Sequence, residues 1–410
     1  MTTSPTRAAW TAVLCWLTVL LEGYDLVALG ATIPTVLGSG HLGFTPAGAT
    51  AVATVSLVGV AFGAAGIGPL SDRYGRRGML LGSVLLFSVF TLLVPVAPSV
   101  SMFGVFRFIA GLGLGACMPV ALTMMAESLP ARYRASASTV TMTGYHVGAV
   151  LTSVLALVVG GEWQWLFYGG GIAGLLVLPL MWWKLPESAA FLAAKERPAT
   201  ERVGPKDLLG GRFRRISIVV WIGSFMGLLL VYGLNTWLPE LMRSAGYPIS
   251  TSITLLLVLN IGAIAGLLLA GVVADRHGIK PTVVAWFAAA AVLLAALSVR
   301  IGSGLLLNLL VLLTGVFVFS AQVLIFGYVT KAFPAEARST ALGLTSAVGR
   351  IGSIVGPFVT GALVTAGVAY PWGFWFFAAI AVLAFAAMLL LSTRTITDDS
   401  DHPARSPQHP

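Results

Sequence analysis

Charged side chains are scarce in this chain. Asp, Glu, Lys and Arg make up 10% of its 410 residues, whereas a soluble domain carries roughly 25% because its surface faces water. Hydrophobic residues make up 57%, and they gather in runs of the length that spans a bilayer. The sequence therefore predicts an integral membrane protein. Its net charge of +9 belongs mainly to loops and implies no nucleic-acid partner.

Cysteine is also nearly absent, and several motifs are missing. Cys15 and Cys117 fall in apolar runs, which favours small core residues over a disulfide or a metal site. The chain has no G-x-x-x-x-G-K-S/T phosphate loop, no nucleophile–base constellation and no metal-spaced cluster. These absences argue against an ATP-driven pump and an enzyme and give no reason to expect a cofactor. The first run, from Trp10, lacks a cleavage pattern and predicts a retained helix.

Apolar runs bounded by Gly, Pro and charged residues predict an all-α membrane protein with twelve transmembrane helices. We expect them at residues 10–36, 47–70, 78–96, 101–125, 136–159, 164–183, 215–240, 250–273, 281–299, 303–330, 339–366 and 372–392. The domains that follow are an N-terminal six-helix bundle (1–183), a linker (184–214), a C-terminal six-helix bundle (215–392) and a disordered tail (393–410). Whether LPESAAFLA in the linker forms an amphipathic helix stays open.

Basic residues predict the orientation. Of the 24 Lys and Arg side chains, Arg107 and Arg350 lie inside predicted spans, and Arg243 and Arg300 lie on one side. The remaining 20 lie on the opposite side. Because basic loops stay in the cytoplasm, both termini and the linker are expected to be cytoplasmic.

Two sequence landmarks repeat at nearly the same offset. GPLSDRYGRR (68–77) follows the second span and GVVADRHGIK (271–280) follows the eighth, with their Asp-Arg pairs 203 residues apart. LPARYRA (129–135) and FPAEARS (333–339) follow the fourth and tenth spans, with their prolines 204 residues apart. The halves are therefore predicted to be parallel repeats related about an axis along the membrane normal.

The repeated loops suggest a conformational latch. Glycine permits tight turns, aspartate can cap a helix N-terminus, and arginine can bond helix-end carbonyls. The candidate gating residues are Gly68, Asp72, Arg73, Gly75, Arg76, Arg77, Asp275, Arg276 and Gly278. The simpler alternative is a basic loop that only sets topology.

Four charged side chains lie well inside the predicted spans: Glu22, Asp25, Arg107 and Arg350. Charge in the membrane is costly and by default suggests function. At about 1.5 Å per residue, Asp25 and Arg107 share one level, and Glu22, Arg350 and His146 share another near the midplane. We expect an Asp25–Arg107 ion pair.

Arg350 is the expected anion anchor, because guanidinium can clamp a carboxylate. Glu22 or Asp25 would then carry the proton. The alternative is that all four charges form structural pairs. His146 could relay protons or be simply hydrogen-bonded, and Asn235, Asn260 and Gln322 could bind substrate or join helices.

The GPLSDRYGRR loop, its weaker second copy and the 6+6 layout resemble the major facilitator superfamily of secondary transporters over nearly the whole chain. LEGYDLVALGATIP in the first span, RFIAGLGLGACMPVALTMMAES in the fourth, and the later YGLNTWLPELMRSAG and AFPAEARSTALGLTSAVGRIGSIVGP resemble its aromatic acid:proton symporter branch. That branch imports benzoate- and hydroxybenzoate-type acids into bacteria.

The resemblance implies roles residue by residue. Asp25 matches the second acid of the branch's Asp-Gly-Tyr/Phe-Asp signature, and Glu22 replaces the first. Arg107 matches the fourth-helix pattern and Arg350 the eleventh-helix Arg-x-Gly, but Val120 stands where Asn commonly follows proline. The glycine run after Arg107 is expected to serve close helix packing.

An aromatic carboxylate needs one fixed cation and an aromatic-lined pocket. Candidate ring contacts, each of which could instead be packing or interfacial belt, are Tyr24, Tyr145, Phe225, Tyr232, Trp237, Phe317 and Phe326.

The sequence therefore favours proton-coupled import of an aromatic or related monocarboxylate, with protons and the lipid bilayer as further partners. A multi-pass monomer in a bacterial inner membrane is expected. The alternatives are a drug or anion exporter of the same fold, or a non-transporting sensor, for which the linker and tail are too short.

Overall fold

The computed structural model describes residues 5–128, 134–188, 210, 213–333 and 335–391, apart from the side chains of 5–8, 68–69, 72, 126–128, 134–139 and 335–339. Most of the predicted linker and the 393–410 tail lie outside the described residues. So do the side chain of Asp72 and the surroundings of Gly68, which are two of the candidate gating residues.

Twelve helices in the described chain are long and apolar enough to cross a membrane, as predicted. They are α1 (Pro5–Ser39), α2 (Pro46–Tyr74), α3 (Arg76–Leu93), α4 (Val100–Ser128), α5 (Arg134–Val159), α6 (Gln164–Lys184), α8 (Arg214–Ser244), α9 (Ile249–His277), α10 (Ile279–Ala296), α11 (Gly304–Ala332), α12 (Ala335–Thr365) and α13 (Ala369–Leu389). Short 3-10 turns, His41–Gly43 and Val94–Val96, follow α1 and α3.

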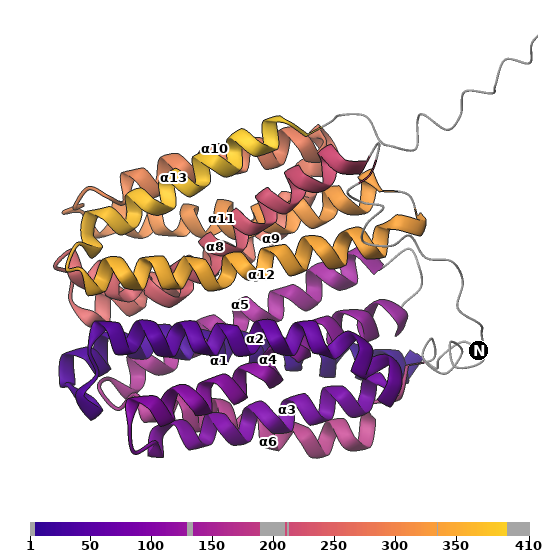
Figure 1. Ribbon diagram of the computed structural model, residues 1–410, viewed down its shortest axis with the longest axis horizontal. Coiled ribbons are helices and arrows are strands. Elements are labelled where there is room, and N and C mark those ends of the chain that lie inside the picture. The colour runs from indigo at the N-terminus through magenta and orange to yellow at the C-terminus, as the bar shows by residue number, and fades with distance from the viewer. Residues whose placement is uncertain (1–4, 129–133, 189–209, 211–212, 334, 392–410) are drawn as a thin grey trace, which may run out of the picture.

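The helices form two bundles, α1–α6 and α8–α13, with their axes running in roughly the same direction (Figure 1). Across the boundary α1 packs on α8, α2 on α12 and α5 on α9. Each bundle has an even number of helices, so its first helix begins at the end of the molecule where its last helix ends. The starts of α1 and α8 and the ends of α6 and α13 all lie at this same end. We call this the linker end, on the right of Figure 1, and the opposite one the far end.

Large apolar side chains cover the outside of the bundles. Leu176, Trp183 and Leu305 are among the most exposed. Exposed apolar area of this extent marks a surface that contacts another apolar phase, here the hydrocarbon of a bilayer.

The glycine run of α4 allows close helix packing, as expected. A Cβ at Gly111 or Gly115 would collide with the backbone of α2, and one at Gly113 with the backbone of α3. In a bilayer, helices associate through such close backbone approach. The glycines thereby fix α4, which carries Arg107, against two neighbours.

The predicted interhelical loops with the Asp-Arg pairs are mostly helical, which corrects the sequence interpretation. Arg73 lies in the last turn of α2, and Asp275 and Arg276 lie near the end of α9. The chain turns at single glycines: Gly75 has φ 91° and ψ 149°, and Gly278 has φ 90° and ψ 149°. Only glycine adopts this region readily, so the chain can leave each helix at these two positions.

Candidate functional site

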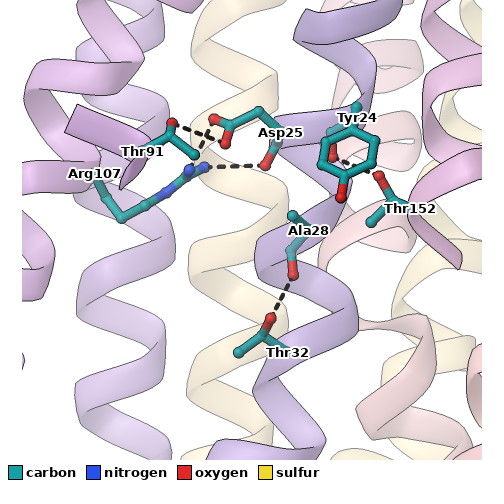
Figure 2. A network of polar contacts seen from close by, with 7 residues as sticks. All are labelled: Tyr24, Asp25, Ala28, Thr32, Thr91, Arg107 and Thr152. Atoms are coloured by element: carbon teal, nitrogen blue, oxygen red, sulfur yellow. Dashed lines mark hydrogen bonds and ion pairs between the residues drawn. The ribbon is translucent and has the colours of Figure 1, made fainter. Parts of the chain in front are cut away.

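Asp25 and Arg107 form the predicted ion pair within the N-terminal bundle. Arg107 Nη1 donates to Asp25 Oδ2 at 2.8 Å, and Thr91 Oγ1 donates to Asp25 Oδ1 at 3.0 Å. Figure 2 shows α1, α3 and α4 converging through these side chains. The Asp25 and Arg107 side chains are 1% and 0% exposed, so the pair is shielded from water and holds α1 against its neighbours.

Glu22 lies three residues before Asp25 on α1 and differs from it in its surroundings. Its side chain is 0% exposed, and neither carboxylate oxygen has a hydrogen-bond partner among the described residues. An ionised carboxylate without a partner is costly in a buried site. Glu22 is therefore a group whose environment favours a change of protonation or the arrival of a ligand.

Arg350, on α12 in the C-terminal bundle, is the counterpart of Glu22. Its Nη1 donates to the hydroxyl of Tyr232 at 2.8 Å. Arg350 and Glu22 interact electrostatically. Among the described side chains, however, no carboxylate oxygen lies within 4.0 Å of an Arg350 nitrogen, the distance that defines an ion pair. The half-buried guanidinium retains donors for an anionic ligand.

A chain of polar side chains joins the two bundles beside these charges. His146 Nδ1 on α5 lies 3.0 Å from Asn260 Oδ1 on α9, and Asn260 Nδ2 donates to Asn235 Oδ1 on α8 at 3.0 Å. Asn260 Nδ2 also donates to the Leu256 carbonyl oxygen, so both its protons are used. The Oδ1 atom is then an acceptor, which requires the proton on Nδ1 of His146.

A small cavity with room for about one water molecule lies at the bundle boundary next to the Arg350 site. It is lined by Leu26, Leu29, Ala53, Ser56, Leu57, Arg107, Tyr145, Tyr232, Asn235 and Thr236. Tyr232 belongs to both places, because it lines the cavity and its hydroxyl accepts from Arg350. Tyr145 and Tyr232 are thus the two predicted ring contacts that the structure brings to the site.

The other predicted ring contacts lie elsewhere. Tyr24 packs on Gly169 and Gly170 of α6. Trp237 is buried and donates to the Pro357 carbonyl oxygen at 2.8 Å, and Phe317 packs edge-on against Trp286. These three contacts correspond to the alternative of helix packing.

Three further candidates, Phe225, Phe326 and Gln322, do not line the cavity. Phe225 and Phe326 are half-buried. Gln322 Nε2 donates to Ser224 Oγ at 3.0 Å and joins α11 to α8. Cys15 and Cys117 are buried free thiols.

Glu240 is a buried acid that the sequence interpretation placed at a span end. It is buried within α8, which continues to Ser244, and Arg243 Nε donates to its Oε2 at 2.8 Å. The side chain was missed because the apolar run ends at residue 240 whereas the helix does not. Its partner one turn along the same helix makes it a local structural pair.

The linker end contains an unpredicted cap. The Glu187 carboxylate accepts from the backbone N–H groups of Arg76 at 3.0 Å and Arg77 at 3.1 Å, at the start of α3. Arg77 Nη2 donates to the Trp182 carbonyl oxygen near the end of α6, as expected for an arginine of this motif. The sequence clue to Glu187 was its position directly after the sixth apolar run, in LPES.

The second copy of the motif is more open. Asp275 lies 3.9 Å from Lys331 Nζ, and both side chains are exposed. Such a surface pair contributes little. The two copies share their glycine geometry but differ in how strongly they bind neighbouring helices.

Comparisons with known proteins identify the family of the chain. The family model for the Major Facilitator Superfamily matches residues 15–357 and, in an overlapping match, 250–409. The chain is 36% identical to a gentisate transporter of Corynebacterium glutamicum, with 92% of this chain and 86% of that protein covered. It is 31% identical to a gallate transporter of Pseudomonas putida, with 94% and 93% covered.

Solved structures show the same fold. The crystal structure of a D-xylose-proton symporter matches with a TM-score of 0.76 at 19% identity, covering 93% of this chain and 97% of that one. At this identity the match concerns the fold alone. Since the family model and both relatives extend over most of a chain that crosses the membrane many times, the protein belongs to the major facilitator superfamily, whose members are transporters and not enzymes.

Proposed function

We propose that this protein imports an aromatic or related monocarboxylate together with protons. The two relatives are named as transporters of gentisate and gallate, which are aromatic carboxylates. One observation carries the proposal: Arg350 and Glu22 bring opposite charges to the boundary between the bundles without forming an ion pair. The cation is free to bind a carboxylate, and the acid is free to bind a proton.

Electrostatics couples the two events. While Glu22 is ionised, it attracts Arg350 and repels a second anion there. A proton on Glu22 removes this repulsion, so carboxylate binding and protonation favour each other, and the coupling is reciprocal. Asp25 is held by Arg107 and Thr91, which supports Glu22 as the proton carrier in this proposal and a positioning role for Asp25.

The parallel repeat supplies the motion in this proposal. Residues 1–183 and 215–392 would rock against each other about the shared site, with 184–214 as their connection. The concentration of basic residues near the linker end supports a cytoplasmic location of both termini in a bacterial cell. A monomer contains the whole site, because the residues around Arg350 and the cavity come from one chain.

Transport into proteoliposomes tests the proposal. Purified protein would be reconstituted and given radiolabelled benzoate, gentisate and gallate, with an acid exterior, with no pH gradient, or with an acid interior. We expect accumulation above the external concentration only with the acid exterior, and its loss on adding a protonophore. Accumulation driven by the acid interior would indicate an exporter. No uptake of any of these acids, or uptake independent of the gradient, would refute proton-coupled import.

A further inference from the structure

Two neighbouring residues of α5, Tyr145 and His146, reach across the boundary to the C-terminal bundle. His146 Nδ1 bonds to Asn260 Oδ1 on α9, and Tyr145 interacts with the Asn235 side chain on α8. The two asparagines are joined to each other through Asn260 Nδ2 and Asn235 Oδ1. All four side chains are buried. This set, which we call the cross-boundary chain, therefore leaves α5 at one residue and returns to it at the residue before.

The donors and acceptors give the cross-boundary chain a direction. Both protons of Asn260 Nδ2 are used, so its Oδ1 accepts and His146 Nδ1 donates. Asn235 Oδ1 accepts from Asn260, and Asn235 Nδ2, which can only donate, has no other partner among the described residues. The Tyr145 hydroxyl is thus the acceptor of Asn235 Nδ2, and its own proton is directed to another group.

Glu22 is the strongest acceptor beside that proton. Helices α1 and α5 touch at this level, because a Cβ at Gly23 would collide with the backbone of Tyr145. Tyr145 and Glu22 interact electrostatically, and both Glu22 oxygens are free of a hydrogen bond to a described side chain. A hydrogen bond from a hydroxyl to an ionised carboxylate is about twice as strong as one between neutral groups.

We propose that His146 is a positioning residue for proton release from Glu22. Through the two asparagines it keeps the Tyr145 hydroxyl turned to donate to the Glu22 carboxylate, which stabilises the ionised acid. No proton passes along the chain: Glu22 loses its proton to water, and the histidine and tyrosine keep theirs. The inference rests on the proposed function, in which Glu22 carries the proton, and adds the group that controls its release.

Other groups also face Glu22 and act on its charge. They come from three further helices: Cys117 on α4, Tyr232 on α8 and Arg350 on α12. Arg350 already favours the ionised acid by its positive charge. The cross-boundary chain adds a hydroxyl donor that remains available when Arg350 binds a substrate anion.

The chain crosses the bundle boundary twice, at Asn260 and at Asn235. It can exist only while the two bundles meet here, and in this conformation they also meet at the far end, where a Cβ at Gly361 would collide with Thr50. In import, substrate and proton leave toward the linker end from such a state. The chain therefore favours the ionised form of Glu22 in the conformation in which import requires proton release.

A pH titration of the whole chain in dodecyl maltoside tests the proposal without any substrate. Infrared spectroscopy follows the carbonyl stretch of protonated carboxyl groups, and subtraction of the Glu22→Gln spectrum isolates the signal of Glu22. Tyr145→Phe removes the hydroxyl that donates to the ionised acid. The midpoint of the Glu22 titration should therefore move to higher pH by about one unit, a tenfold change in proton affinity.

Variants of His146 separate positioning from packing. His146→Leu removes the first donor and should move the midpoint to higher pH by at least about threefold in proton affinity. His146→Asn keeps a donor at the place of Nδ1 and should retain the original midpoint. Tyr145→Phe/His146→Leu should shift it no further than Tyr145→Phe alone, because the histidine acts through the tyrosine. If His146→Leu does not fold, Asn235→Leu interrupts the same chain and should give the same shift.

The outcomes separate this inference from the proposed function. An unchanged midpoint in Tyr145→Phe or in His146→Leu would overturn it, as would equal shifts in His146→Leu and His146→Asn, or additive shifts in the double variant. Absence of gradient-driven uptake by a protein whose Glu22 titrates as expected would instead refute proton-coupled import alone. A chain in which no Glu22 signal titrates would refute both.

Discussion

At the scale of single residues, the two acids of α1 have different surroundings although they lie three residues apart. Asp25 has a cation and a hydroxyl as partners, whereas Glu22 has neither. Burial makes any unpaired charge costly. In the proposed function, the partners around each carboxylate, rather than its depth in the membrane, therefore distinguish the structural acid from the acid that exchanges a proton.

Loss of Arg107 should expose the structural role of the ion pair. Arg107→Met leaves the Asp25 carboxylate buried without its cation and should lower the free energy of unfolding by about 3–5 kcal/mol. The double variant Asp25→Asn/Arg107→Met removes both charges and should recover part of that loss. Thermal unfolding in detergent measures the effect, with Lys331→Met, which breaks the exposed pair with Asp275, as the control. Equal destabilisation in the single and double variants would contradict this account.

Glu22→Gln should uncouple transport from the proton gradient. The amide keeps the shape of the side chain but cannot take up a proton, and it no longer repels an anion at Arg350. Exchange of labelled for unlabelled acid at equal pH should persist, while accumulation driven by an acid exterior should fall to the level of empty vesicles. Glu162→Gln, at an exposed acid in the turn before α6, is the control. Gradient-driven accumulation by Glu22→Gln would mean that another group carries the proton.

Arg350→Lys should weaken acid binding by about tenfold while the protein still folds. Lysine retains the charge, but it cannot grip a carboxylate with two parallel donors. Displacement of a radiolabelled acid measures the change, and Arg300→Lys, at an exposed arginine at the far end, serves as the comparison. An unchanged dissociation constant in Arg350→Lys would remove Arg350 from the anion site.

The residue pairings differ in how far the sequence could predict them. The Asp25–Arg107 pair was accessible because helical rise alone places two opposite charges at one level. The position of Tyr24 was not, because membrane helices are apolar on most faces. The sequence pattern therefore does not reveal that this ring points to α6 while Tyr145 and Tyr232 line the cavity.

At the scale of helices, the start of α3 is tied to the segment that follows α6. One Glu187 oxygen accepts from two successive N–H groups that have no partner inside α3. The carboxylate also lies at the positive end of the helix dipole. This contact spans 111 residues of sequence, which explains why a local motif suggested a cap but not its source.

Removal of the Glu187 carboxylate should loosen this end of the bundle. Glu187→Ala leaves two backbone donors without their acceptor and should lower the free energy of unfolding by about 1–2 kcal/mol. Thermal unfolding of the purified protein measures it. Glu162→Ala, which removes an exposed acid, should leave the melting temperature unchanged. A stability of Glu187→Ala equal to that of the control would show that the cap contributes nothing.

At the scale of the whole molecule, the described residues bring the two bundles into close contact at the far end. A Cβ at Gly30 on α1 would collide with the backbone of Asn235 on α8, and one at Gly361 on α12 would collide with Thr50 on α2. The twelve helices and their repeat were predictable, because apolar length and repeated motifs are local properties. Which end of the molecule is closed depends on contacts between bundles, and no local pattern specifies them.

Alternating access requires these far-end contacts to separate during each cycle. The pair Thr50→Cys/Gly361→Cys should form a disulfide between the bundles, since a side chain at Gly361 would touch Thr50, and the native cysteines are buried. Oxidation should abolish uptake, and reduction should restore it. Gly48→Cys/Val100→Cys is the control, because it joins two helices of one bundle at the same end and should leave uptake intact. Uptake by the oxidised Thr50→Cys/Gly361→Cys variant, with the cross-link confirmed by mass spectrometry, would show that the far end need not open and would refute the rocking of one bundle against the other.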